Sequence, residues 1–176
     1  MLIILDRDGV INLESREYIK SPEEWIPIPG SLEAIAKLKQ CGHHVVIATN
    51  QSGIARGLYT REILDDIHNK MHNMLNEFGA KIDGIFYCPH HPDDNCLCRK
   101  PKPGLLHQIA ENMNADLSKA MMVGDSLRDL QAAQAVNCQP VLVRTGNGES
   151  VLKENAELPG VKVFVDLASF AKSLDN

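Results

Sequence analysis

Near its start the chain reads Ile3-Ile4-Leu5-Asp6-Arg7-Asp8-Gly9-Val10, a short apolar run that ends in two carboxylates and a glycine. The apolar run predicts a buried strand. Alternate residues of a strand point to the same side, so Asp6 and Asp8 can converge on one reacting centre or one cation. Gly9 lets the chain turn away behind them. An ordinary strand followed by an Asp-rich turn is the alternative, and residues elsewhere in the chain decide between the two.

The length and composition predict one globular domain, residues 1–176. Apolar residues make up 44% of the chain and charged residues 23%, and no apolar run approaches the roughly 20 residues that a membrane span needs. Charges at residues 6–8 interrupt the apolar core that a signal peptide would require. The net charge of −5 argues against a nucleic-acid-binding surface, which needs a basic excess. We therefore expect a cytoplasmic monomer with no nucleic-acid or membrane partner.

Predicted strands alternate with predicted helices along the chain, and Ser31 is expected to cap the first helix. The strands are expected at residues 1–5, 45–48, 85–87, 120–123, 140–143 and 161–165, and the helices at residues 32–41, 60–78, 104–113, 130–136 and 169–174. This order predicts a three-layer, Rossmann-like α/β fold, with helices on both faces of a parallel sheet. A loop and one helix separate the first two strands, which leaves no room for a large cap domain.

Three further polar groups lie after predicted strands. Thr49 opens a polar turn that contains a glycine, Asp125 follows the fourth strand, and Lys100 lies in a basic stretch that prolines stiffen. In a parallel α/β sheet the carboxyl ends of the strands meet at one edge, where ligands bind. Hydroxyl and backbone N–H groups in such a turn suit a phosphoryl oxygen. We therefore expect Thr49, Lys100 and Asp125 to meet Asp6 and Asp8 at this edge.

A second group of reactive side chains lies between the third strand and the basic stretch. Cys88 and His90 are separated by one residue, as are Cys96 and Cys98. Three thiolates and one imidazole form a complete tetrahedral ligand set for structural Zn²⁺. A disulfide is disfavoured in a cytoplasmic protein. His91 is the rival of His90, but the matching one-residue spacings favour His90, and zinc here would tie down the basic stretch.

Other residues have plainer explanations. His68 and His72 lie four residues apart on a predicted helix and could share a metal, although packed or solvated histidines are commoner. Cys41 and Cys138 are expected to be buried as small hydrophobic residues. Trp25, in a long proline-rich loop, either lines a pocket or covers the core.

The chain carries four ordered motifs that resemble those of the haloacid dehalogenase-like phosphatases: D-R-D-G, T-N-Q-S-G, R-K-P-K-P-G and G-D-S-L-R-D. The resemblance extends over most of the chain, from Leu2 to about Val143. The C-P-H-H-P…C-x-C loop narrows it to the branch that contains histidinol-phosphate and heptose-bisphosphate phosphatases. The R-K-P-x-P-G motif resembles the heptose-bisphosphate enzymes, whereas the short loop between His91 and Cys96 resembles the histidinol-phosphate enzymes.

The resemblance implies a phosphatase that works through a covalent aspartyl-phosphate. Asp6 would attack phosphorus, and Asp8 would protonate the leaving oxygen and then activate water. Asp6, Asp125 and the Asp8 carbonyl would bind Mg²⁺, which prefers oxygen ligands. Thr49 and Lys100 would hold the phosphoryl oxygens.

The expected substrate is a phosphosugar, with heptose 1,7-bisphosphate favoured and its 7-phosphate removed. The expected substrate contacts are Asn50, Arg99, Lys102 and Arg128, of which the three cations would be available to a second phosphate. Asp129 is expected to orient the metal site rather than to ligate the metal. Histidinol phosphate is the alternative substrate. A non-catalytic phosphosugar-binding module is disfavoured because every residue that catalysis needs is present, and a mutase would need a large cap.

Overall fold

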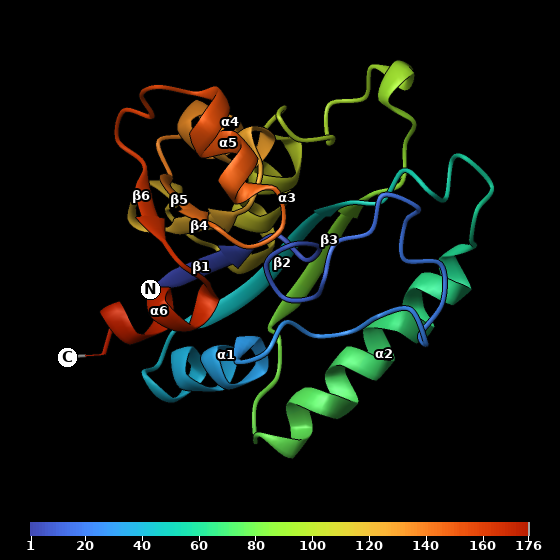
Figure 1. The fold of residues 1–176 in the computed structure, drawn as a ribbon, viewed down its shortest axis with the longest axis horizontal. Helices are drawn as coiled ribbons and strands as arrows, with labels where there is room; N and C mark the ends of the chain where they lie inside the picture. The colour runs from blue at the N-terminus through green and yellow to red at the C-terminus, as the bar shows by residue number, and fades with distance from the viewer. Residues whose placement is uncertain (176) are drawn as a thin grey trace.

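Six parallel strands form one sheet in the computed structural model, which describes residues 1–175 (Figure 1). The strands are β1 (Leu2–Leu5), β2 (His44–Asn50), β3 (Gly84–Cys88), β4 (Met121–Gly124), β5 (Gln139–Val143) and β6 (Lys162–Phe164). Their spatial order is β3-β2-β1-β4-β5-β6. Ile3 of β1 pairs with Val45 of β2 on one side and with Met121 of β4 on the other. The strand that precedes Asp6 therefore lies inside the sheet and has a neighbour on each side.

Helices cover both faces of this sheet (Figure 1). One face carries α1 (Ser31–Gln40), α2 (Arg61–Glu77) and α6 (Leu167–Ser173), and the other carries α3 (Gly104–Met113), α4 (Leu127–Ala135) and α5 (Gly148–Glu154), with short 3₁₀ helices η1 (Pro92–Asp94) and η2 (Leu117–Lys119) in the loops. Ile3 and Leu5 point into the core beneath α1 and α2, whereas Leu2 and Ile4 point into the core beneath α3 and α4. Burial on both faces explains the unbroken apolar runs in the sequence.

The three-layer α/β fold predicted from the sequence is confirmed, and within residues 1–175 no cap domain is inserted between β1 and β2. Sequence reasoning missed α5, because its only apolar residues, Val151 and Leu152, are adjacent and show no helical period. Ser31 does not cap α1. Gly30 takes the N-cap position with a φ of 84°, and Ser31 Oγ donates to the Ile11 carbonyl oxygen at 2.6 Å. Cys138 is buried as expected, but Cys41, just past the end of α1, is exposed.

The long loop between β1 and α1 is held against α2. Lys70 of α2 donates hydrogen bonds to the carbonyl oxygens of Pro22 at 2.6 Å and Trp25 at 2.8 Å. Trp25 is fully buried and belongs to the core beneath α1 and α2, so it covers the core rather than lining a pocket. None of the helices described in the chain is both long and apolar enough to span a membrane.

The order of the strands reverses at β1. The chain steps from β1 through β2 to β3, crosses back to β4, and then steps outward through β5 to β6. The carboxyl ends of the strands at such a reversal frame a crevice in which α/β proteins bind ligands. Because Asp6 follows β1 and Asp125 follows β4, the fold places two carboxylates at this crevice.

Candidate active site

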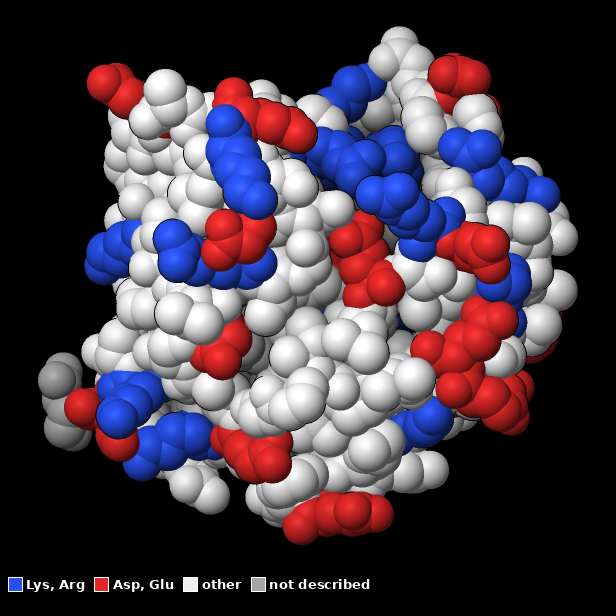
Figure 2. Space-filling view, in the orientation of Figure 1, with Lys and Arg blue, Asp and Glu red and all other residues white. Residues whose placement is uncertain are grey.

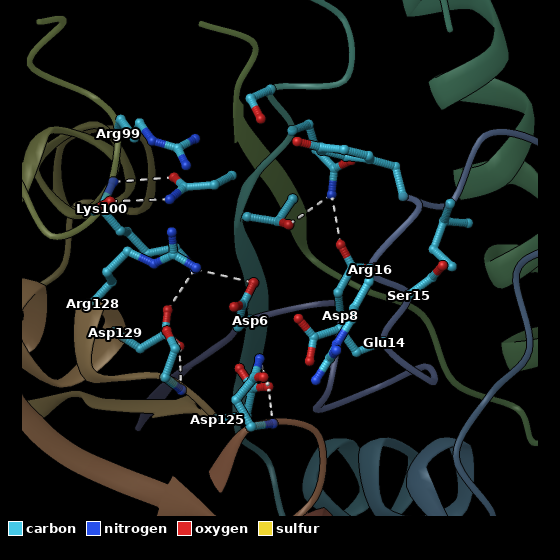
Figure 3. Close-up of a pocket in the computed structure, with 18 of the residues that line it drawn as sticks. Asp6, Asp8, Glu14, Ser15, Arg16, Arg99, Lys100, Asp125, Arg128 and Asp129 are labelled. Atoms are coloured by element: carbon cyan, nitrogen blue, oxygen red, sulfur yellow. Dashed lines mark hydrogen bonds and ion pairs between the residues drawn. The ribbon is translucent and has the colours of Figure 1, made fainter. Parts of the chain in front are cut away.

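A polar pocket of about 370 Å³ opens at the carboxyl ends of β1, β2 and β4. Figure 2 shows a hollow with acidic side chains inside it and a group of basic side chains along one side. Figure 3 shows side chains from well-separated parts of the chain facing one another around this space. The pocket is lined by all five residues predicted to carry the chemistry: Asp6, Asp8, Thr49, Lys100 and Asp125.

Three carboxylates and one ammonium group form the base of the pocket. Asp6, Asp125 and Asp129, which we call the carboxylate cluster, each place an oxygen within 4.8 Å of the others. The Lys100 ammonium lies 3.0 Å from Asp6 Oδ1 and 2.7 Å from Asp129 Oδ1, and it donates to the Ala48 carbonyl oxygen at 2.6 Å. Lys100 is only 1% exposed, so water screens its charge little.

Burial and mutual repulsion change the acidity of these carboxyl groups. Burial and the nearby Asp129 raise the pKa of Asp6 to about 7, although Lys100 opposes the shift. Burial and Asp6 likewise raise the pKa of Asp125 to about 8. A divalent cation would relieve this repulsion, and carboxylate oxygens are the ligands that Mg²⁺ prefers. The carboxylate cluster therefore has the donor chemistry of a magnesium site.

The loop after β5 holds Asp125 in place. Asp125 Oδ2 accepts hydrogen bonds from the backbone N–H of Asn147 at 2.8 Å and from its side-chain amide at 3.1 Å. Gly9 and Gly146 both have positive φ, and a Cβ atom at either position would overlap the Asp125 carboxylate. Both glycines are therefore needed for the close approach of the two loops to Asp125.

Asp129 is oriented by its own helix. Its Oδ2 accepts from the backbone N–H of Ser126 at 3.1 Å and from the Ser126 hydroxyl at 2.7 Å, so it closes the first turn of α4. Its Oδ1 forms the ion pair with Lys100. These contacts fit the orienting role predicted for Asp129, since they engage both of its oxygens.

Asp8 is held by hydrogen bonds on both carboxylate oxygens. Oδ1 accepts from Arg7 Nε at 3.1 Å, from Arg7 Nη2 at 2.9 Å and from Asn12 Nδ2 at 2.8 Å. Oδ2 accepts from Gln51 Nε2 at 3.1 Å. Burial by itself would raise the pKa of Asp8, but Arg7 and the two amides outweigh burial and leave that pKa below its usual value.

The turn after β2 supplies Thr49 and Asn50. Thr49 is buried, and its Oγ1 accepts from Gln51 Nε2 at 2.9 Å. Asn50 lines the pocket and also exchanges two hydrogen bonds with the backbone of Lys100, through its Nδ2 at 3.0 Å and its Oδ1 at 3.1 Å. Asn50 therefore joins the end of β2 to the loop that carries Lys100.

A second group of metal-binding side chains lies at the end of β3. Cys88, His90, Cys96 and Cys98, which we call the thiolate cluster, each place a donor atom within 4.8 Å of the rest. Cys98 Sγ lies 3.2 Å from Cys88 Sγ and 3.6 Å from Cys96 Sγ, and His90 Nδ1 lies 3.2 Å from Cys98 Sγ. Ligands of one tetrahedral Zn²⁺, at bond lengths of about 2.0–2.3 Å, are separated by similar distances. The thiols are free, so the donor set fits structural zinc.

The other histidines have different contacts. His91 Nδ1 accepts a hydrogen bond from the backbone N–H of Asp93 at 3.2 Å and caps η1, so His90 joins the thiols and His91 does not. His68 Nε2 lies 3.2 Å from Arg7 Nη1. In the part of the chain that the structure describes, neither His68 nor His72 belongs to a group of metal-binding side chains.

Residues 2–137 match the model of the haloacid dehalogenase-like hydrolase family. The chain belongs to this family. A D-glycero-β-D-manno-heptose-1,7-bisphosphate 7-phosphatase of Pseudomonas aeruginosa is 56% identical over 174 residues, which cover 98% of this chain and 97% of the relative. The solved structure of a D,D-heptose 1,7-bisphosphate phosphatase from Bordetella bronchiseptica, complexed with magnesium and phosphate, is 54% identical with a TM-score of 0.96, covering 98% and 97% of the two chains. A D,D-heptose 1,7-bisphosphate phosphatase from Burkholderia thailandensis is 41% identical with a TM-score of 0.79, covering 99% and 98%.

In this haloacid dehalogenase-like hydrolase one side of the pocket is basic. Arg99 and Arg128, which we call the basic wall, line the pocket, and Figure 3 shows them on the same side as Lys100. Arg99 Nη1 is buried and has no hydrogen-bond partner among residues 1–175. Burial and the charge of Arg128 lower the pKa of Arg99. Two guanidinium groups beside a cavity favour the binding of an anion there.

Lys102 is the one predicted substrate contact that the structure does not bring to the pocket. Its ammonium group donates to Asn95 Oδ1 at 2.5 Å and to the carbonyl oxygens of Asn95 and Cys96 at 3.3 and 3.0 Å. Lys102 therefore points back to the loop that carries the thiolate cluster, where these oxygens accept its hydrogen bonds.

Several pocket residues of this hydrolase were missed by sequence reasoning. Glu14, Ser15, Arg16 and Tyr18 line the pocket from the loop between β1 and α1, and the Arg56 guanidinium lies 5.7 Å from the centre of the Tyr18 ring. The only available signal was that long, proline-rich ordered loops are often functional. No motif marked these residues individually.

Proposed function

We propose that this hydrolase removes the 7-phosphate of D-glycero-β-D-manno-heptose 1,7-bisphosphate through an aspartyl-phosphate on Asp6. One observation carries the proposal: a single pocket combines the carboxylate cluster and Lys100, which suit phosphoryl transfer, with a basic wall that suits a second phosphate. The relatives support the same substrate, since the P. aeruginosa protein is named for this reaction and the B. bronchiseptica structure holds magnesium and phosphate.

The first step transfers the phosphoryl group to the protein. The Asp6 carboxylate attacks phosphorus, the bond between phosphorus and the sugar oxygen breaks, and an aspartyl-phosphate forms. Lys100, which lies 3.0 Å from Asp6, and the Thr49 hydroxyl oppose the charge on the phosphoryl oxygens. Mg²⁺ held by Asp6, Asp125 and the Asp8 carbonyl would neutralise charge, so that a carboxylate can approach an anionic phosphate.

Asp8 transfers the protons in both steps. The negative charge of a phosphate bound beside Asp8 would favour its protonated form. In that form it donates to the departing sugar oxygen, which would otherwise leave as a poorly stabilised alkoxide. In its carboxylate form it then takes a proton from the water that attacks the aspartyl-phosphate. This second displacement releases inorganic phosphate, regenerates Asp6 and returns the proton to Asp8.

The basic wall would bind the phosphate that is not removed. Arg99 follows Cys98 directly in the chain, so zinc in the thiolate cluster would hold the backbone beside this guanidinium. Arg99 can bind a phosphate through two parallel hydrogen bonds, which a lysine cannot do. A bisphosphate would therefore be bound at both ends, whereas histidinol phosphate offers only one phosphate.

We further propose that the protein works as a monomer in the cytoplasm. The pocket of a single chain already contains every residue assigned to the reaction, so catalysis does not require a second copy. The thiolate cluster requires reduced cysteines, which a cytoplasmic compartment maintains. Light scattering during size-exclusion chromatography would test the oligomeric state, and a dimer at micromolar concentration would contradict this part of the proposal.

Phosphate release from a panel of substrates tests the proposed function. The purified protein is assayed with Mg²⁺ and heptose 1,7-bisphosphate, hexose bisphosphates, sugar monophosphates and histidinol phosphate. We expect the highest kcat/KM for heptose 1,7-bisphosphate, with heptose 1-phosphate as the product identified by NMR. A higher kcat/KM for histidinol phosphate would overturn the substrate assignment and leave the phosphatase mechanism intact.

A further inference from the structure

We infer that Gln51, oriented by Tyr59, is a positioning residue that aims Oδ2 of Asp8 at the leaving oxygen. The inference rests on the proposed reaction, in which Asp8 protonates that oxygen. It adds the side chains that determine which carboxylate oxygen delivers the proton and where that oxygen lies relative to the phosphoryl group.

One oxygen of Asp8 is already fully engaged. Oδ1 accepts three hydrogen bonds at 2.8 to 3.1 Å, two from Arg7 and one from Asn12. A carboxylate oxygen has about two lone-pair positions, so three donors leave no room for a proton on Oδ1. Arg7 is fully buried, and its remaining Nη1 faces His68 Nε2 at 3.2 Å, which keeps the guanidinium in place. The transferable proton is therefore carried by Oδ2.

The side-chain amide of Gln51 connects Oδ2 to the phosphate-binding turn that carries Thr49. Its Nε2 donates to Asp8 Oδ2 at 3.1 Å and to Thr49 Oγ1 at 2.9 Å. Because the Thr49 oxygen accepts from Gln51, the hydroxyl hydrogen of Thr49 remains available to a phosphoryl oxygen. Gln51 Nε2 thus fixes the distance between the Asp8 carboxyl group and the Thr49 hydroxyl, which holds the phosphoryl group.

Tyr59 determines which end of the Gln51 amide faces Asp8. The Tyr59 hydroxyl donates to Gln51 Oε1 at 2.5 Å, and both side chains are buried. The ring reaches this position because residue 53 is a glycine, since a Cβ atom on Gly53 would overlap the Tyr59 ring. This contact explains the glycine of the T-N-Q-S-G motif, whose φ is not positive.

The orientation of the amide matters for the proton transfer. As Asp6 forms its bond to phosphorus and the bond between phosphorus and the sugar oxygen breaks, the O–H bond at Asp8 Oδ2 also breaks and its proton moves to the sugar oxygen. A Gln51 amide turned the other way would present Oε1, an acceptor, to the same proton. The proton would then be held by the protein rather than aimed at the leaving group, so Tyr59 favours transfer by excluding this arrangement.

Removing the Tyr59 hydroxyl tests the inference, because the effect should depend on whether the leaving group needs a proton. The variant Tyr59→Phe keeps the ring that packs on Gly53, and kcat/KM is measured for heptose 1,7-bisphosphate and for p-nitrophenyl phosphate. A sugar oxygen needs a proton in order to leave, whereas p-nitrophenolate does not. We expect a roughly tenfold loss of kcat/KM for the sugar, part of the 10²–10⁴-fold that general acid–base catalysis contributes, and a loss of less than about twofold for p-nitrophenyl phosphate. The ratio kcat/KM reports the steps up to leaving-group departure, so slower hydrolysis of the aspartyl-phosphate does not affect it.

The matched control is Tyr87→Phe, because the Tyr87 hydroxyl contacts exposed Arg61 and does not line the pocket. This variant should match the wild type with both substrates. A second variant, Gln51→Met, removes the amide and should lose more activity with the sugar than with p-nitrophenyl phosphate. Equal losses for the two substrates in either pocket variant would overturn the inference.

The test also separates this inference from the proposed function. If the wild type hydrolyses p-nitrophenyl phosphate but not heptose 1,7-bisphosphate, the proposed substrate is wrong. Phenyl phosphate then replaces the sugar, since phenolate is a poorer leaving group than p-nitrophenolate. A larger loss with phenyl phosphate in Tyr59→Phe would support the inference, and equal losses would overturn it.

Discussion

The two clusters of metal-binding side chains in this protein are assembled in different ways. The thiolate cluster comes from residues 88–98, the end of β3 and the loop that follows it, and its three thiols and one imidazole are the ligand set of a tetrahedral zinc site. The carboxylate cluster brings together residues from distant parts of the chain. Asp6 follows β1, whereas Asp125 and Asp129 follow β4. The polar atoms of this cluster are carboxylate oxygens, and it faces a cavity.

The clusters are assembled differently because the thiolate cluster holds the structure of a loop, whereas the carboxylate cluster takes part in the chemistry. A closed site can be built locally, since it only has to hold its own loop. An open site must leave space for substrate and therefore draws its ligands from several strand ends. Arg99 and Lys100 join the two, because they follow the last thiol in sequence and face the carboxylate cluster in space.

The largest effect is expected from Asp6→Asn, which removes the nucleophile of the carboxylate cluster. The amide has nearly the same shape but is a poor nucleophile, so turnover should fall by roughly 10⁴-fold or more while the protein stays folded. Phosphate release gives the rate, and mass spectrometry verifies that the new side chain has not deamidated. The exposed helix residue Asp65 provides a matched control as Asp65→Asn. A verified Asp6→Asn protein with appreciable turnover would contradict the covalent mechanism.

Removing zinc tests whether the thiolate cluster supports the carboxylate cluster. Zinc is released with a thiol-blocking mercurial and chelator, and the protein is then returned to Mg²⁺ with reductant. We expect activity lower by about 10²-fold, because a displacement of Lys100 and Arg99 by about 1 Å misplaces the phosphoryl group. Zinc should restore activity, whereas Mg²⁺ alone should not. Full activity in protein shown by metal analysis to be free of zinc would refute this dependence.

The acidity of the carboxylate cluster makes magnesium activation depend on pH. Burial raises the pKa of Asp6 to about 7 and that of Asp125 to about 8, so without metal these groups hold protons near neutral pH. Mg²⁺ must displace these protons, and its binding therefore strengthens as the pH rises. The Mg²⁺ concentration that gives half-maximal rate should fall by about fiftyfold from pH 6 to pH 7, where two protons are displaced, and by about tenfold from pH 7 to pH 8, where about one is displaced. A half-maximal concentration that stays constant or rises would contradict the assigned ligands.

The smallest effect is expected from Arg99→Lys, a change in the segment that connects the two clusters. The charge is kept but the paired hydrogen bonds to phosphate are lost, so KM for the bisphosphate should rise several-fold, by about fivefold. KM for a sugar monophosphate should change by less than about twofold. The exposed Arg61 supplies the control, since Arg61→Lys changes a guanidinium outside the pocket. Equal changes for both substrates would show that Arg99 does not bind the second phosphate.

The sequence by itself determined the layers of the fold and the thiolate cluster. Apolar strands alternating with amphipathic helices leave few arrangements other than a parallel sheet covered on both faces. The spacing of Cys88, His90, Cys96 and Cys98 is local, so a short loop brings these side chains together without help from distant segments. Asp6, Asp8, Thr49, Lys100 and Asp125 were also predicted from the sequence to share one edge of the sheet, because each follows a strand, and all five line the pocket.

Only the tertiary structure decided where the remaining side chains point. Lys102 and Arg99 are three residues apart in one basic stretch, yet Arg99 lines the pocket and Lys102 donates to the carbonyl oxygens of Asn95 and Cys96. The partners of Gln51 and the pocket residues Glu14 to Tyr18 were likewise beyond sequence reasoning. Local patterns specify backbone conformation and spacing, whereas the direction of a long polar side chain depends on which distant donors and acceptors packing brings within reach.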